Sequence, residues 1–399
     1  MTSGLRQRTA YPAKGVPTKS PVALRPCPVS PTFGEHTPGA FSPDVGLTGR
    51  ADFGLWISVP FASRRGTLTG MSDIGFVPHL TKRTADLRRE AITPWMLRGK
   101  EFDSPYYGLH RPAGIAAEQP SLRVADAIAL MTPGCILTGW AARWIQGQAF
   151  CDGVLYGKDL PVTILCGPGT EIRQRPGIRP RERRYLPGEV VDLGDVTATT
   201  MARAAYDDML DAPNRLEALV AVEMATSTVI EQSQTPLANV QRVFDAHVKT
   251  RGRVQARWAL ANATTRSASP WETRTRVLAT EATGIDDWLV NVPLFDEHEN
   301  LLGIPDLTDP ESSLILESDG ADHRRIAVHD NDNVREETFE NHGAAVVRIG
   351  SAQHGRAERP TTMQRILAGR QLAFEMGPQQ WTSEKPAWWW EWPPGRRWD

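Results

Sequence analysis

Several features that would assign a function class are missing from this chain of 399 residues. No run of about 18 or more apolar residues occurs, so the sequence predicts no membrane span. The N-terminus also lacks the apolar core of a signal peptide. The four cysteines form no C-x-x-C pair, which argues against a zinc finger and a disulfide framework. We therefore expect a cytoplasmic protein with reduced thiols.

Overall charge and nucleotide-binding motifs are also uninformative. The formal net charge is −2 at pH 7 and the pI is about 6.5, so no global attraction to nucleic acid or anionic membranes is expected. Any such contact needs a local basic patch. Neither G-x-x-x-x-G-K-[ST] nor H-E-x-x-H occurs, which argues against a P-loop nucleotide site and a zinc protease.

Residues 1–70 differ in composition from the rest of the chain. They hold nine prolines, nine glycines, eight basic residues and three acidic residues. Such a segment cannot bury enough apolar surface to offset its chain entropy, so we expect disorder. Two interpretations stay open. The segment is a flexible basic arm that touches nucleic acid, or it is an upstream extension of a chain that naturally begins at Met71, which we favour.

The middle of the chain is expected to fold in two parts. Within 71–120, the helical stretch "TADLRREAI" is followed by the alternating, basic stretch "RGKEFDSPYYGLHRP", the outline of a winged helix. Residues 121–250 predict a mainly helical α+β domain, with helices at "SLRVADAIALM", "GWAARWIQG", "TATTMARAAYDDML" and "PNRLEALVAVEMAT" and a buried strand at "PVTILCG".

Six arginines fall between residues 173 and 184, interrupted by prolines and a glycine. Arginines in such a run make phosphate contacts, so Arg173, Arg175 and Arg181 are candidates for nucleic-acid binding. The alternative is a solvated linker loop, which is the commoner fate of a charged run.

The pattern over 252–376 predicts helix, three strands, helix and strand, followed by a final helix. Ser269 and Pro270 open the first helix in "SPWETR", the turn "DEHENL" joins "WLVNVPLF" and "LLGIPDL" as a hairpin, and "SLILESD" forms the third strand. A polar helix is expected over roughly 331–342, before the strand "AAVVRIG". The fold class is therefore mixed α/β.

The third strand ends in an unusual set of charges. Side chains alternate along a strand, so Ile315, Glu317 and Asp319 share one face. If the preceding strand pairs with it, Asp306 comes close to Glu317, and Pro305 fits an edge or a bulge there. Neighbouring carboxylates repel unless a cation lies between them, so Asp306 and Glu317 are candidate ligands for Mg²⁺ or another divalent cation.

Two further residues complete the candidate catalytic set. Gly320 permits a turn that brings back His323, whose ordinary pKa suits proton transfer. Glu272 could reach the same metal through a water, although its place three residues after Ser269 is also that of a capping box. Each of Asp306, Glu317, Asp319 and His323 also has a plain interpretation as a turn, strand-end or surface residue.

The stretch "GIPDLTDPESSLILESDGADH", with "SPWETR" upstream and "HDNDNVREETFENHGAAVVRIG" downstream, resembles the PD-(D/E)XK nuclease superfamily. It is most similar to the bacterial branch related to the very-short-patch repair endonuclease, which reads E-x-D-G and then a histidine. The resemblance implies a restriction-endonuclease-like αβββαβ core over about 255–375. It assigns the metal to Asp306 and Glu317, and it sets Asp319 where other members carry lysine.

The same resemblance implies Mg²⁺-dependent cleavage of DNA. It makes Arg335 a substrate or structural contact. Arg324, directly after His323, is a further candidate for nucleic-acid contact. The region from "LRGKEFDSPYYGLHRPAG" through "LTGWAARWIQG" to "PVTILCGPG" is similar to type IV abortive-infection antitoxins, which implies DNA or partner binding. The alternative function is a non-catalytic DNA-binding regulator or antitoxin that keeps a nuclease-like fold.

The chain ends in a tryptophan-rich tail over residues 377–399. Six of the 13 tryptophans lie in the last 19 residues. They could stack bases, but we expect them to pack against the body of the protein, a protein partner or a second copy, because exposed tryptophan runs are unfavourable.

Overall fold

A computed structural model of the protein describes residues 79–115, 120–167, 169–170, 172–230, 232, 234–319 and 335–390. The expected disordered arm, His323, Arg324 and the end of the tryptophan-rich tail lie outside these residues. The described part is mixed α/β with several small sheets, which confirms the expected fold class. Within it, no helix is both long and apolar enough to cross a membrane.

The first described segment contains a small antiparallel sheet of order β1-β3-β2. Its strands are short because the segment is polar, and Leu87, Leu97 and Leu109 are its buried apolar side chains. The helix and alternating strands expected here are present, although the helix is only six residues long. The bounds are β1 (Lys82–Arg83), α1 (Thr84–Arg89), η1 (Met96–Arg98), β2 (Phe102–Asp103) and β3 (Leu109–Pro112).

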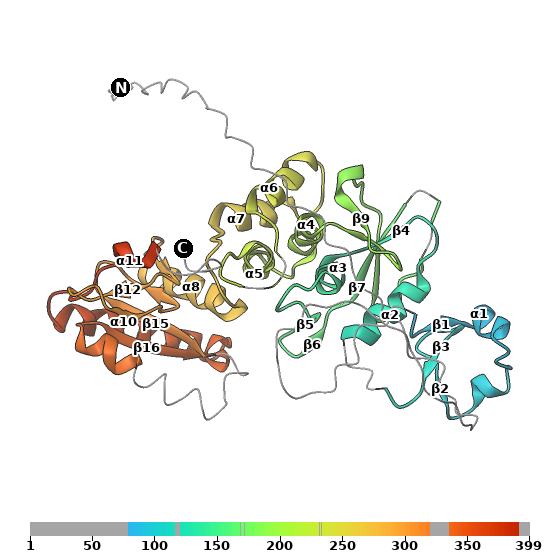
Figure 1. The fold of residues 1–399 in the computed structure, drawn as a ribbon, viewed down its shortest axis with the longest axis horizontal. Coiled ribbons are helices and arrows are strands. Elements are labelled where there is room, and N and C mark those ends of the chain that lie inside the picture. Colours follow the sequence, from blue (N-terminus) through green and yellow to red (C-terminus); the bar gives the residue numbers. More distant parts are fainter. Residues whose placement is uncertain are drawn as a thin grey trace, which may run out of the picture. The chain divides into compact units, whose positions relative to one another are not determined.

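The second segment is built on a five-stranded sheet of order β8-β7-β4-β10-β9. Three of its strands, β4, β7 and β9, are labelled in Figure 1. The strands β4 and β7 are fully buried, as their apolar runs predict. The helices α2 and α3 follow the expected apolar periods, and a two-stranded hairpin, β5-β6, stands beside them. The bounds are α2 (Pro120–Leu130), β4 (Cys135–Thr138), α3 (Gly139–Ile145), β5 (Val154–Leu155), β6 (Lys158–Asp159), β7 (Val162–Cys166), β8 (Ile178–Arg181), η2 (Pro187–Glu189), β9 (Val190–Asp192) and β10 (Thr197–Thr199).

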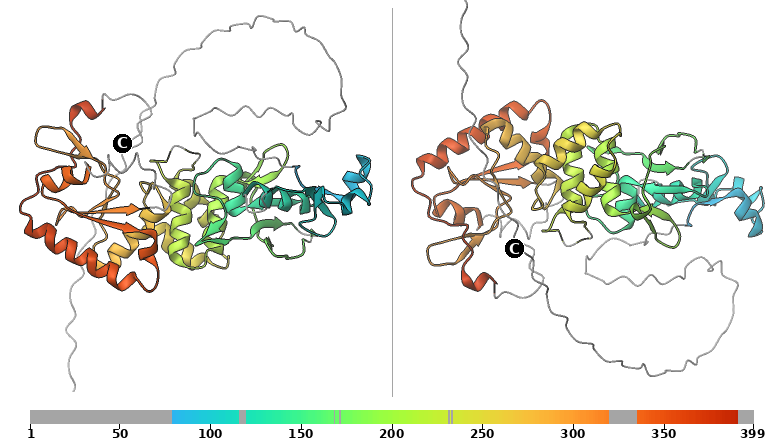
Figure 2. Two further views of the ribbon diagram at one scale, coloured as in Figure 1. Left: turned by 90° about the horizontal axis from the view of Figure 1, so that it is seen from below. Right: turned by 90° about the horizontal axis from the view of Figure 1, so that it is seen from above.

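Four helices form the next layer, drawn in green to yellow in Figure 2. Thr200 and Asn214 cap the first two, each accepting a backbone N–H three residues on. Tyr206, Leu219 and Phe244 meet in one core with small residues of the last helix, which therefore packs with this layer rather than with the C-terminal sheet. The bounds are α4 (Met201–Asp211), α5 (Arg215–Thr226), α6 (Leu237–Ala246) and α7 (Arg253–Asn262).

The C-terminal segment has a four-stranded sheet of order β11-β14-β15-β16, in which β15 and β16 are parallel and the other pairs antiparallel. A separate hairpin, β12-β13, forms at the expected turn. Residues 335–341 are helical and lead into β16, within the expected range. The bounds are α8 (Pro270–Thr283), β11 (Leu289–Val290), β12 (Leu294–Phe295), β13 (Leu301–Gly303), β14 (Leu307–Thr308), β15 (Leu314–Asp319), β16 (Ala345–Gly350), η4 (Ser351–His354) and α10 (Arg359–Glu375).

The predicted alternation along β15 is confirmed by the two cores of this segment. Leu314 and Leu316 pack in one core with side chains of α8 and α10. Ile315 packs in the other with Phe339 and Trp381. The strand is therefore covered on both faces up to its last residues, and its charged end emerges from this covered stretch.

The described part of the tryptophan-rich tail folds back onto the same segment. It ends in α11 (Ala387–Trp390). Trp389 is fully buried, with its ring centroid 5.4 Å from that of Phe295. The indole N–H of Trp388 donates to the carbonyl of Glu299 at 3.0 Å. Packing onto the body is confirmed for these residues, while Trp390 remains 62% exposed.

Candidate functional site

Asp306 and Glu317 come from neighbouring antiparallel strands. The β14-β15 register pairs Leu307 with Leu316 and Thr308 with Ile315, and its continuation sets Asp306 opposite Glu317. The Asp306 carboxylate (Oδ2) accepts the backbone N–H of Ser318 at 2.7 Å, directly after Glu317. The sequence expectation that Asp306 lies beside the end of the following strand is therefore met.

Glu317 is held by a basic residue from the following helix. Its Oε2 accepts from Nη2 of Arg335 at 2.9 Å, and the side chains are 11% and 37% exposed. Arg335 thus lies beside the candidate carboxylates. Asp319, two residues further along the same strand, is exposed at its end. The guanidinium of Arg335 therefore balances part of the negative charge of the carboxylates that were expected to bind a metal ion.

Glu272 has the helix-start role considered for it, and its carboxyl lies near Asp306. Its backbone N–H donates to the hydroxyl of Ser269 at 3.2 Å, as in a capping box. The reciprocal bond differs, because Oε2 accepts from the backbone N–H of Ala268 and from Nδ2 of Asn291, both at 2.7 Å. Burial, and next the charge of Asp306, raise the pKa of Glu272 to about 8. Glu272 is therefore a helix-start residue whose carboxyl also interacts electrostatically with Asp306.

Unlike Arg335, the candidate nucleic-acid-binding arginines Arg173, Arg175 and Arg181 make their described contacts away from these carboxylates. Arg181 forms an ion pair with Asp211, Arg175 lies over the ring of Tyr106 with a distance of 5.7 Å to the centroid, and Arg173 is exposed. Residues 178–181 of this run form β8, whose arginines make ion pairs. The run is therefore not simply a solvated linker loop.

The sequence did not single out a chain of hydroxyl groups beside Asp306. Ser318 donates through its hydroxyl to Oγ1 of Thr275 at 2.9 Å, and that oxygen lies 3.2 Å from Nε2 of His354. Burial, with Arg274 and Arg359 nearby, lowers the pKa of His354 to about 4. Two signals could have found these residues. Thr275 is three residues after Glu272 on one helix, and His354 follows the strand parallel to β15.

The donor chemistry of these side chains suits a hard cation, but the described residues do not complete a metal site. Carboxylate oxygens are the ligands that Mg²⁺ prefers. Within the described ranges, however, no group of three or more His, Cys, Asp and Glu side chains is arranged to hold a metal ion. Asp306 and Glu317 supply two suitable groups, and the expected histidine lies outside these ranges.

Comparison with known proteins assigns no family to the chain. No protein-family model matches the sequence, and no curated protein matches it significantly. Its function must therefore be inferred from the residues and contacts described above.

Proposed function

We propose that the C-terminal segment is a restriction-endonuclease-like domain that hydrolyses phosphodiester bonds in DNA with the help of Mg²⁺ or another divalent cation. One observation carries the proposal: Asp306, directly before β14, accepts the backbone N–H of Ser318, the neighbour of Glu317 on β15, where the buried part of that strand ends. Apart from the hairpin β12-β13 inserted after β11, the order of α8, β11, β14, β15, the helix at 335–341 and β16 is that of the expected αβββαβ core.

In this proposal Asp306 and Glu317 hold the cation, and Glu272 stands close to Asp306. A bound Mg²⁺ would polarise the phosphodiester and lower the pKa of a bound water. Arg335 lies next to Glu317, and a guanidinium has five N–H donors, so it can bind a phosphate oxygen while keeping its carboxylate partner. His323 is the proposed proton-transfer group, and Asp319 occupies the place of the usual lysine.

A second candidate function is a DNA-binding regulator of the antitoxin type that has lost cleavage. The ion pair between Glu317 and Arg335 favours it, because a fixed guanidinium can replace a metal ion as the partner of a carboxylate. In that case the nuclease-like domain is a scaffold, and DNA binding or partner contact depends on residues 71–250.

The test is a plasmid-cleavage assay with Mg²⁺, with Mn²⁺ and with EDTA. Asp306→Asn and Glu317→Gln keep the shape of each side chain while removing its charge. The matched control is Glu337→Gln, an exposed glutamate on the helix at 335–341. We expect the wild type and the control to cut in a metal-dependent way, and the two site variants to lose at least roughly 100-fold in rate.

Two results would contradict the nuclease proposal. One is cleavage that survives both Asp306→Asn and Glu317→Gln. The other is the absence of cleavage with every divalent cation, and DNA binding without cleavage would then favour the regulator.

A further inference from the structure

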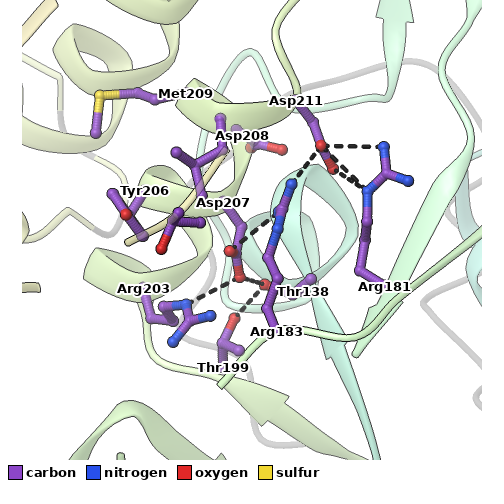
Figure 3. A network of polar contacts seen from close by, with 12 residues as sticks. Thr138, Arg181, Arg183, Thr199, Arg203, Tyr206, Asp207, Asp208, Met209 and Asp211 are labelled. Carbon is purple, nitrogen blue, oxygen red and sulfur yellow. Dashed lines mark hydrogen bonds and ion pairs between the residues drawn. The ribbon is translucent and has the colours of Figure 1, made fainter. Parts of the chain in front are cut away.

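The arginine-rich stretch converges on one carboxylate at the end of α4. Asp211 forms ion pairs with Arg181 at 3.1 Å and with Arg183 at 2.5 Å (Figure 3). A third ion pair, at 3.8 Å, joins it to Arg179. One carboxylate cannot neutralise three guanidinium groups. Three basic side chains from β8 and the segment after it thus gather at this end of the helix.

A second carboxylate one turn earlier binds Arg183 and a further arginine, Arg203. Asp207 is fully buried and accepts from Arg183 at 3.1 Å, from Arg203 at 3.0 Å and from the hydroxyl of Thr138 at 2.7 Å (Figure 3). Arg203 also pairs with Glu189. Each of these arginines is thus bound by at least one carboxylate.

Three other basic side chains face the same place without such partners. Arg184 directly follows Arg183, and Lys249 and Arg251 lie in the connection between α6 and α7. All three are exposed, and none makes an ion pair or side-chain hydrogen bond within the described part of the chain. Their charges are free to meet a ligand.

The two groups of side chains line one cleft of about 580 Å³. Among the described residues of its lining, Leu210 is the only apolar one, and Thr250 adds a hydroxyl group. Six described basic side chains line the cleft. Only four described carboxylates lie in the lining or directly behind it, namely Glu182, Asp211, Asp207 and Glu189. The six basic residues are Arg181, Arg183, Arg184, Arg203, Lys249 and Arg251.

We propose that this cleft binds phosphate groups of a nucleic-acid backbone. A polar, positively charged cleft suits a multiply charged oxyanion better than an apolar ligand. Arginine guanidinium groups bind phosphate oxygens in pairs, and the fixed arginines present their donors with little loss of side-chain entropy. Arg184, Lys249 and Arg251 add the mobile charges that neutralise successive phosphates.

The choice of nucleic acid over a free phosphate compound rests on the proposed function, in which DNA is the substrate. The cleft is built from β8, the segment after it, α4 and the α6–α7 connection, whereas the candidate carboxylates lie on β14, β15 and α8. The inferred DNA contact therefore involves residues of the cleft, which take no part in the proposed cleavage reaction.

The experiment measures binding without cleavage. A fluorescently labelled duplex of about 20 base pairs is titrated with the full chain in EDTA, by anisotropy, over a series of salt concentrations. The variant carries Arg184→Gln, Lys249→Gln and Arg251→Gln together. The control carries Lys158→Gln, Arg242→Gln and Arg257→Gln, which removes the same charge from exposed positions outside the cleft. Equal thermal midpoints for the two triple variants would show that both remain folded.

We expect the cleft variant to bind roughly tenfold more weakly than the control at about 0.1 M salt, with a salt-dependence slope lower by about 2 to 3. Equal affinities for the two variants, or no DNA binding by the wild type, would overturn the inference. A parallel titration with inorganic pyrophosphate separates the two sources of phosphate. If the substitutions abolish pyrophosphate binding and leave DNA binding intact, the cleft serves a free phosphate compound and the assignment to nucleic acid is wrong.

This result is independent of catalysis because EDTA is present throughout. Weaker DNA binding by the cleft variant would support the inference about the cleft even if the plasmid assay detects no cleavage. Conversely, metal-dependent cleavage by the wild type would stand even if the cleft variant bound DNA normally.

Discussion

The buried carboxyl of Glu272 predicts an unusual dependence of stability on pH. The side chain is 6% exposed, and burial together with the charge of Asp306 raises its pKa from 4.5 to about 8. Its folded pKa lies above its unfolded pKa. Its contribution to stability is therefore fully present below about pH 4.5 and is lost as the pH rises toward 8, because only the unfolded chain ionises freely in that range.

The magnitude follows from the shift. Each pKa unit corresponds to roughly 1.4 kcal/mol, so the free energy of unfolding should fall by roughly 3 kcal/mol between pH 5.5 and 8.5 on account of this group alone. Glu272→Gln removes the ionisation but keeps an oxygen that can accept from Ala268 and Asn291. We expect the variant to match the wild type near pH 5 and to be more stable by roughly 3 kcal/mol at pH 8.5.

The assay is urea denaturation followed by tryptophan fluorescence at pH 5.5, 7.0 and 8.5, with Glu337→Gln as the control for removing an exposed carboxylate. Asp306→Asn should recover part of the lost stability at high pH, since it removes the second cause of the shift. A constant difference between the wild type and Glu272→Gln across this pH range would refute the reasoning, because it would mean that Glu272 ionises normally in the folded protein.

Two further substitutions test the packing that supports these sites. Asp207→Asn should lower the free energy of unfolding by roughly 1.5–3 kcal/mol, since Arg203 and Arg183 each lose one of the two carboxylates that bind them, whereas the exposed Asp286→Asn should leave the urea midpoint unchanged. Gly369→Ala would favour the helix α10 by roughly 1 kcal/mol from propensity. Its methyl group would, however, lie 2.5 Å from Val347 and 3.2 Å from Leu314, so we expect a net loss of roughly 1–3 kcal/mol, and a higher melting temperature would contradict the packing argument.

The sequence predicted the strand β15 and its two faces well because the pattern there is local. Apolar residues alternate between two cores, and both cores are large enough to fix the register. The expected strands before it are each broken in two. Asn291 has a φ of 49°, and Pro293 lacks a backbone N–H, so "WLVNVPLF" cannot continue as one ladder. Pro305 interrupts "LLGIPDL" in the same way, next to Asp306.

The candidate site was only partly predictable because its contacts depend on distant segments. Pairing of the strands, which the sequence suggested, brings Asp306 beside Glu317. The partner of Glu317 comes from a helix 18 residues later, and Asn291, which bonds Glu272, has its position set by the break between β11 and β12. The ion pairs of the arginine run depend on α4, and nothing local in "RPRERR" shows that Asp207 and Asp211 will meet it.

The buried charges around α4 and those near α8 and β14 have different partners. Around α4, buried carboxylates face arginines, so each charge helps to hold the fold. At α8 and β14, by contrast, the buried carboxyl of Glu272 lies near another carboxylate, Asp306. A glutamine at position 272 could accept the same two hydrogen bonds without that repulsion, so folding alone does not require an acidic group there. A site that recruits a cation does require one. Neighbouring acids are thus better explained by the proposed chemistry than by stability, and Glu272→Gln should separate the two by gaining stability while losing metal-dependent cleavage.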